Sequence, residues 1–76
     1  MKLSRFIKYL EKIQSSYGDI PVSGNIINSD NCYLSSLCVD TTEEEPQLLI
    51  EVESSADIPV FNCYEYPSYK EINLEN

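Results

Sequence analysis

Histidine is absent from this chain of 76 residues. Without it there is no Ser–His or Cys–His nucleophilic pair, and the commonest general base near neutral pH is missing. Glycine occurs only at Gly18 and Gly24, and neither opens a helix after a strand, so a glycine-rich phosphate loop is excluded. A pair of carboxylates would need a deep cleft to raise one pKa, which so short a chain rarely encloses. We therefore expect no enzymatic activity.

Cysteine is also scarce. The chain has three cysteines, Cys32, Cys38 and Cys63, and this odd number cannot all pair within one chain. Their spacing contains no CxxC motif, and they are fewer than the four Cys or His ligands that a closed zinc site usually needs. They predict reduced thiols that act as small core hydrophobes, with no metal and no cofactor. No apolar run approaches the ~20 residues of a membrane span, and no signal peptide is evident. We expect a cytoplasmic protein.

Basic residues are few and lie mostly at one end. Residues 1–12 hold four of the five Lys and Arg residues, but only one of the thirteen Asp and Glu residues. The formal net charge of −8 therefore arises from residues 13–76. The electrostatic field of so negative a chain repels nucleic acid and membrane surfaces and favours a basic partner. A need for solubility alone also explains a negative charge.

Residues 4–17 form the clearest predicted element. Apolar side chains recur at helical spacing and form one stripe, made of Leu3, Phe6, Ile7, Leu10, Ile13 and Tyr17. Ser4 stands where an N-cap residue is expected, and Gly18 stands where a helix commonly stops. The pattern predicts an amphipathic helix that needs a partner surface to be stable.

Extended segments follow the helix. Strands are predicted near residues 19–23, 33–41, 47–53 and 58–64. The sequence Asp-Ile-Pro-Val occurs at 19–22 and at 57–60, where its proline indicates an edge strand. Tyr33, Ser35, Leu37 and Val39 are expected to share one face. In 47–53, Leu48, Ile50 and Val52 alternate with Gln47, Leu49, Glu51 and Glu53, and a hairpin with 33–41 is expected.

Together these elements predict one small domain over residues 1–76 with an α+β fold. The N-terminal amphipathic helix packs on a three- to four-stranded antiparallel sheet. The tail, residues 65–76, is expected to be partly ordered, with fraying after Ile72.

Two groups of side chains are candidates for contact with a partner. The acidic residues of the predicted hairpin are Asp40, Glu43, Glu44, Glu45, Glu51 and Glu53, and the clustered tyrosines are Tyr64, Tyr66 and Tyr69. Carboxylates at strand spacing present a rigid negative field, and tyrosine is common at interfaces. A solvated turn also explains the turn carboxylates. Oxygen ligands for calcium are the less favoured alternative, because the turn lacks the D-x-D-x-D-G order.

The helix offers a second, basic face. Arg5, Lys8 and Lys12 lie opposite the apolar stripe at spacings of three and four. Arg5 and Lys8 stand near the helix start, where the dipole favours anions. They form either a plain solvent-exposed face or a contact for an acidic neighbour. Three cations on an acidic protein are too few to indicate a nucleic-acid-binding surface.

The opening residues, MKLSRFIKYLEKIQSSYGDIPV, resemble the start of many short phage and prophage proteins. These share an amphipathic helix near the first residue, then Gly-Asp-x-Pro-Val, then a hairpin. The resemblance implies a viral or mobile-element origin, and hence the cytoplasm of the host cell, and it supplies no site residues. Small acidic proteins in that setting are often inhibitors of host enzymes, including defence nucleases.

Three functions remain open at this point. The first is an acidic, nucleic-acid-mimicking inhibitor that binds a host protein with a basic surface, without direct contact to nucleic acid or membrane. The second is a structural or assembly protein that forms a homodimer through sheet edges or the helix. The third is a small enzyme or metal protein.

Overall fold

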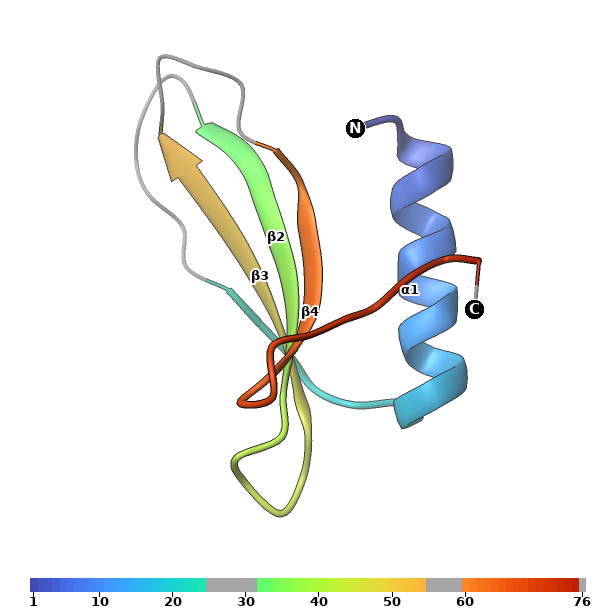
Figure 1. The fold of residues 1–76 in the computed structure, drawn as a ribbon, viewed down its shortest axis with the longest axis vertical. Helices are drawn as coiled ribbons and strands as arrows, with labels where there is room; N and C mark the ends of the chain where they lie inside the picture. The colour runs from blue at the N-terminus through green and yellow to red at the C-terminus, as the bar shows by residue number, and fades with distance from the viewer. Residues whose placement is uncertain (25–31, 55–59, 76) are drawn as a thin grey trace.

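The computed structural model describes residues 1–24, 32–54 and 60–75 (Figure 1). Within these ranges one helix, α1 (Leu3–Tyr17), precedes five strands. The strands are β1 (Val22–Gly24), β2 (Cys32–Asp40), β3 (Gln47–Ser54), β4 (Asn62–Tyr66) and β5 (Lys70–Glu71). Helix α1 stands against one face of the sheet, roughly along the direction of the strands. The predicted α+β class is confirmed.

The helix begins one residue earlier than predicted. Lys2 is the N-cap residue, and its carbonyl accepts hydrogen bonds from the backbone N–H groups of Arg5 and Phe6. Ser4 therefore lies inside the first turn, and the N-cap role predicted for it is wrong. The predicted stop is confirmed, because Gly18 adopts a positive φ of 86° and donates its N–H to the Gln14 carbonyl. Glycine enters this conformation without the steric cost of a Cβ atom.

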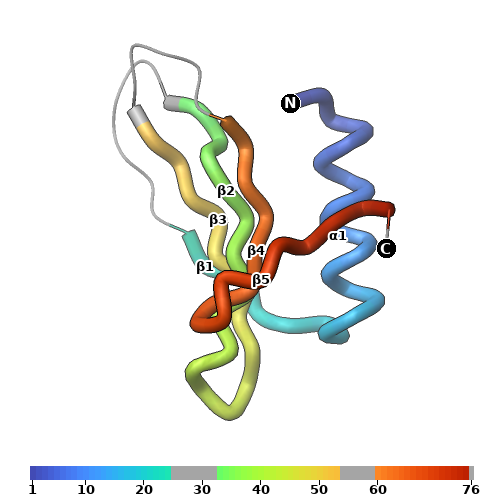
Figure 2. The backbone as a smooth tube through the Cα atoms, in the orientation of Figure 1, coloured from blue at the N-terminus to red at the C-terminus, as the bar shows by residue number. Residues whose placement is uncertain are grey.

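The sheet is mixed, with the strand order β1-β3-β2-β4-β5. The β2–β3 hairpin is antiparallel as predicted, with Val39 opposite Leu48. However, β1 pairs in parallel with β3, and β4 pairs in parallel with β2, so the prediction of a purely antiparallel sheet with three or four strands is wrong. Figure 2 shows the reason: α1 delivers the chain to the end of the sheet at which β3 starts, so β1 and β3 run the same way. Side-chain alternation predicts a strand but not the end from which it enters.

The edge strands also differ from the prediction. The first Asp-Ile-Pro-Val segment does lead into an edge strand, β1. The last predicted strand, near 58–64, lies partly outside the described residues, and β4 begins at Asn62 and continues to Tyr66. Because β5 pairs with it, β4 is not an edge. A strand of two residues is too short to leave a periodic pattern in the sequence.

A β-bulge changes which residues of β2 share a face. The register shifts between Leu34 and Ser36, so that Tyr33 lies opposite Glu53 and Leu34 opposite Val52. The extra residue moves Tyr33 away from the face that carries Leu37 and Val39. The prediction that Tyr33 joins these residues is therefore wrong.

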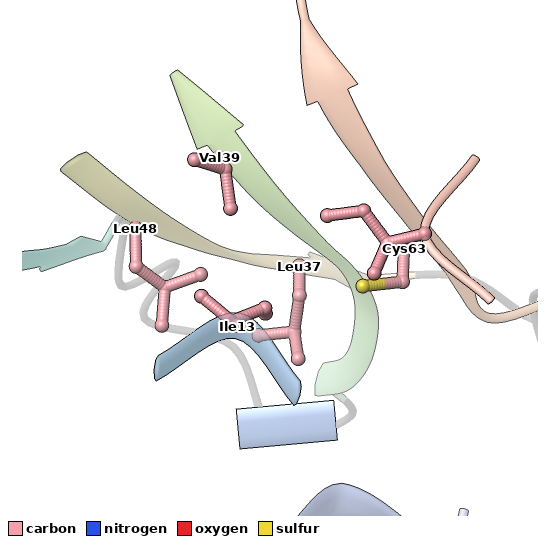
Figure 3. Packing of buried hydrophobic residues seen from close by; sticks show 6 residues of the cluster. Ile13, Leu37, Val39, Leu48 and Cys63 are labelled. Atoms are coloured by element: carbon pink, nitrogen blue, oxygen red, sulfur yellow. The ribbon is translucent and has the colours of Figure 1, made fainter. Parts of the chain in front are cut away.

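The hydrophobic core lies between α1 and the sheet (Figure 3). Its buried members are Ile13, Leu37, Val39, Leu48, Cys63 and Ile72. Ile13 is the only helical residue among them, and Leu37 is completely buried. Ile72 donates its N–H to the Cys63 carbonyl and packs into the same cluster. The C-terminal segment thus continues the core across the sheet toward α1, as Figures 1 and 2 show.

Replacement of Leu37 by alanine tests this core. The side chain is fully buried, so its loss leaves a cavity, and we expect the free energy of unfolding to fall by about 2–5 kcal/mol. Urea denaturation followed by circular dichroism measures the change. Val60→Ala is the matched control, because Val60 is 92% exposed and its truncation should change stability by less than about 0.5 kcal/mol. Equal effects of the two substitutions would contradict the assignment of the core.

Candidate functional site

The side of the sheet that faces away from α1 carries most of the candidate contact residues. Successive side chains of a strand alternate between faces, so the neighbours of the core residues point to this side. Cross-strand pairing aligns them, with Cys38 opposite both Leu49 and Tyr64, and Asp40 opposite Tyr66. We call this surface the open face. It comprises Tyr33, Ser36, Cys38, Asp40, Gln47, Leu49, Glu51, Glu53, Asn62, Tyr64, Tyr66 and Glu71, together with the Tyr69 ring that stacks on Tyr64.

The three clustered tyrosines contact one another. The rings of Tyr64 and Tyr69 are stacked, with centroids 5.8 Å apart and an interplanar angle of 13°. The rings of Tyr66 and Tyr69 meet edge to face, with their centroids 5.4 Å apart. Tyr69 has a positive φ of 55°, which is uncommon for a residue with a Cβ atom, and 69% of its surface is exposed. The turn between β4 and β5 therefore presents this ring to solvent.

A hydrogen bond joins the tyrosines to the acidic strand. The Tyr64 hydroxyl donates to Oε1 of Glu51 at 3.0 Å. Burial raises the pKa of Tyr64 well above its ordinary value, and this hydrogen bond to Glu51 raises it further. Tyr64 therefore remains a neutral donor to the Glu51 carboxylate beside the aromatic cluster. Below them Cys38 is buried, and this burial raises the pKa of its thiol.

Asp40 has a local role at the end of β2. Its carboxylate accepts hydrogen bonds from the backbone N–H of Thr42 at 2.9 Å and from the Thr42 hydroxyl at 2.7 Å. These bonds lower the pKa of Asp40. Thr41 is tied to the next strand, because its N–H and hydroxyl both donate to the Tyr66 carbonyl. Asp40 thus fixes the start of the turn as well as adding negative charge.

The nine predicted contact residues form two neighbouring groups. Glu51, Glu53 and the three tyrosines lie on or beside the open face. Glu43, Glu44 and Glu45 are exposed in the turn between β2 and β3, which extends beyond the end of the sheet in Figure 1, and Asp40 connects the two groups. The calcium alternative gains no support, since no three His, Cys, Asp or Glu side chains gather at one point within residues 1–24, 32–54 and 60–75.

The basic residues lie on the helical side. The Arg5 guanidinium is 5.6 Å from the centre of the Tyr9 ring, a cation–π distance, and Lys12 is half-buried beside a hollow that Lys70 also lines. Helix α1 covers the face opposite the aromatic cluster. The cations of α1 therefore lie on the opposite side of the sheet from the aromatic cluster, although Glu11 lies on the same helix.

The prediction of free, buried cysteines is confirmed for two of the three residues. Cys38 and Cys63 are free thiols and both are buried. In the register of β2 and β4, Cys63 lies opposite the core residue Leu37, whereas Cys38 lies opposite Tyr64 of the open face. The two thiols therefore point to opposite faces of the sheet. Burial raises the pKa of Cys63 to about 12, which makes it unreactive near neutral pH. The side chain of Cys32 lies outside the described part of the chain.

Some residues of this surface are absent from the sequence-based prediction. Leu49 and Asn62 belong to the open face, and Val60 and Ser35 line a hollow on it. The alternation in residues 47–53 already places Leu49 with Glu51. No sequence signal places Asn62, because its position depends on the parallel register between β2 and β4.

Comparisons of the chain with protein families, with curated proteins and with solved structures found no match. In the described part of the chain no helix has both the length and the apolar character needed to cross a membrane. Any argument about function therefore rests on the site itself.

A Tyr64→Phe variant tests the contact between the aromatic cluster and Glu51. Loss of the donor should lower the free energy of unfolding at neutral pH by about 0.5–1.5 kcal/mol. The raised pKa of Tyr64 also predicts that stability depends on pH. The stabilising effect of Tyr64 is complete below pH 10.0, the ordinary pKa of tyrosine, and is lost as the pH rises above that value.

Urea denaturation at neutral pH and at several pH values above 10.0 measures both effects. The wild type should lose stability more steeply than Tyr64→Phe over the alkaline range. Tyr17 remains in both proteins, and its pKa, raised to about 12 mainly by burial, contributes equally to the two curves. Parallel curves would show that Tyr64 titrates as an ordinary phenol.

Proposed function

We propose that this protein is a non-enzymatic, protein-binding protein of the phage inhibitor type. In this proposal the open face and the β2–β3 turn occupy a basic, nucleic-acid-binding groove of a host or defence protein. The observation that carries the proposal is the position of Glu51, Glu53 and the tyrosine cluster on the sheet face opposite α1. In a small domain with one covering helix, large aromatic side chains on that face expose area suited to a partner.

The geometry of the carboxylates supports a rigid acidic surface. Glu51 and Glu53 are two residues apart on β3, so their side chains emerge on the same face about 7 Å apart. The Tyr64 hydroxyl fixes the position of Glu51. A fixed array of negative charges costs little entropy on binding and accelerates association with a positive surface.

The turn extends this acidic surface beyond the sheet. Glu43, Glu44 and Glu45 are all exposed, and Asp40 holds the turn through its hydrogen bonds to Thr42. A protruding acidic turn can enter a groove that the flat sheet face only covers. With a net charge of −8 the chain would repel nucleic acid, so competition for a shared basic groove is the favoured mode of action.

Reversal of the turn charges tests this function. The triple variant Glu43→Lys, Glu44→Lys, Glu45→Lys should retain its fold, because these side chains are exposed. It should lose capture of the partner from a bacterial host lysate by about tenfold or more, since attraction becomes repulsion. The wild type should capture a basic nucleic-acid-binding protein, identified by mass spectrometry, and added DNA should displace that protein.

A matched control reverses three exposed carboxylates elsewhere in the molecule. Glu11→Lys, Asp19→Lys, Glu75→Lys changes the net charge equally but leaves the open face and the turn intact. This control should capture the same protein as the wild type, with only a modest loss. Equal loss in both triple variants, or a captured protein that DNA does not displace, would contradict the proposal.

A second function, self-assembly, is favoured by an apolar surface on the opposite side. Leu3 and Ile7 are 72% and 44% exposed on successive turns of α1, and Val22 of β1 is 62% exposed. Ile7 and Val22 line one open groove of about 240 Å³ together with Leu10, Ile20 and Leu48. The short edge strands β1 and β5 offer few backbone groups for pairing, so this groove is a better dimer contact than a sheet edge.

Light scattering distinguishes the two functions. A dimer formed through the groove should have twice the monomer mass at high micromolar concentration, and Ile7→Ser should return it to a monomer by removing apolar contact area. Tyr66→Ser, on the open face, serves as the control and should leave the mass unchanged. A wild type that stays monomeric excludes self-assembly as the function.

A further inference from the structure

The open face contains a hollow beside the stacked tyrosines. Its volume is about 290 Å³, and it is lined by Ser35, Ser36, Glu53, Val60, Asn62, Tyr64 and Tyr69. These residues come from β2, β3, β4 and the β4–β5 turn, except for Val60, which precedes β4. The hollow therefore exists only in the assembled sheet, and it adds a specific feature to a surface otherwise characterised by its charge.

The aromatic wall of the hollow favours a cation. Tyr64 and Tyr69 are in direct stacking contact, so a ligand group must lie beside this pair and not between the rings. The negative π face of a tyrosine ring attracts ammonium and guanidinium groups. Tyr69 is well exposed, and its backbone conformation holds it at the rim of the hollow.

The polar side chains that line the hollow also favour a positively charged ligand. Glu53 provides a carboxylate, and among the described residues that line the hollow none is Lys or Arg. The Glu51 carboxylate lies next to Tyr64, through their hydrogen bond, and adds to the negative potential. Ser36 and Asn62 provide further oxygen atoms that can accept hydrogen bonds. The exposed Val60 side chain offers an apolar contact at the edge.

We infer that this hollow binds an arginine side chain of the partner protein. A guanidinium group is planar and can lie against a tyrosine ring while its N–H groups reach the Glu53 carboxylate and neighbouring oxygens. Its aliphatic stem would contact Val60. A lysine ammonium is compact and strongly hydrated, so it matches a ring surface and several acceptors less well. The inference rests on the proposed function, in which the open face is the contact surface.

Peptide binding to the full chain tests the inference. The probes are fluorescent oligo-arginine and oligo-lysine of equal length, with oligo-citrulline as the uncharged isostere, and anisotropy at low salt gives their affinities. The wild type should bind oligo-arginine about three- to tenfold more tightly than oligo-lysine, because the cation–π contact and the fork of hydrogen bonds favour guanidinium. Oligo-citrulline should not bind measurably.

Two variants, each lacking one carboxylate, show which part of the surface causes the preference for arginine. Glu53→Gln removes a carboxylate from the hollow, and Glu43→Gln removes one from the turn. Glu53→Gln should abolish the preference for arginine, whereas Glu43→Gln should weaken both cationic peptides equally and keep the preference. Tyr69→Asn should also abolish the preference, because asparagine tolerates the positive φ at this position but lacks the ring.

The outcomes separate this inference from the proposed function. Equal affinity for the two cationic peptides, with equal effects of Glu53→Gln and Glu43→Gln, would overturn the arginine site while leaving a general acidic binding surface. No binding of either cationic peptide by the wild type would overturn both. Backbone amide NMR of each variant confirms that it remains folded, so that a lost preference reports on the site.

Discussion

The packing of α1 on the β2–β3 hairpin is the contact on which the other features depend. Ile13 of the helix meets Leu37, Val39 and Leu48 of the hairpin, and these are among the most buried residues of the chain. An isolated helix of 15 residues and an isolated hairpin are each marginal in water, so each needs the apolar surface of the other. Cys63 and Ile72 then extend the same cluster and draw β4 and the C-terminal segment onto it.

One helix covers only one face of the sheet, and this constraint creates the candidate site. The opposite face must satisfy its own polar groups and remain compatible with water. It does so through the hydrogen bond from Tyr64 to Glu51, through the stacking of Tyr64 on Tyr69, and through exposed carboxylates such as Glu53. The same side chains that make this face compatible with solvent also give it negative charge and aromatic area, which are the properties of a surface for a basic partner.

The sequence predicts the local elements well, because their signals are local. The apolar stripe and Gly18 fix the helix and its end, and the alternation around Leu48 and Ile50 fixes β3 and the buried face of the hairpin. The predictions for Ser4 and Tyr33 are wrong for equally local reasons. The helix starts one residue earlier than the cap pattern suggests, and a bulge between Leu34 and Ser36 changes the alternation.

The sequence by itself determined the charge separation, the lack of histidine chemistry and the presence of an α+β fold, since these follow from composition and periodicity. Only the tertiary structure decided the direction and order of the strands. Parallel pairing of β1 with β3 and of β4 with β2 depends on where α1 and the connecting segments return the chain. That arrangement brings Glu53, Asn62 and Tyr69 to one hollow, although they lie on separate segments, because cross-strand register joins residues that no sequence spacing relates.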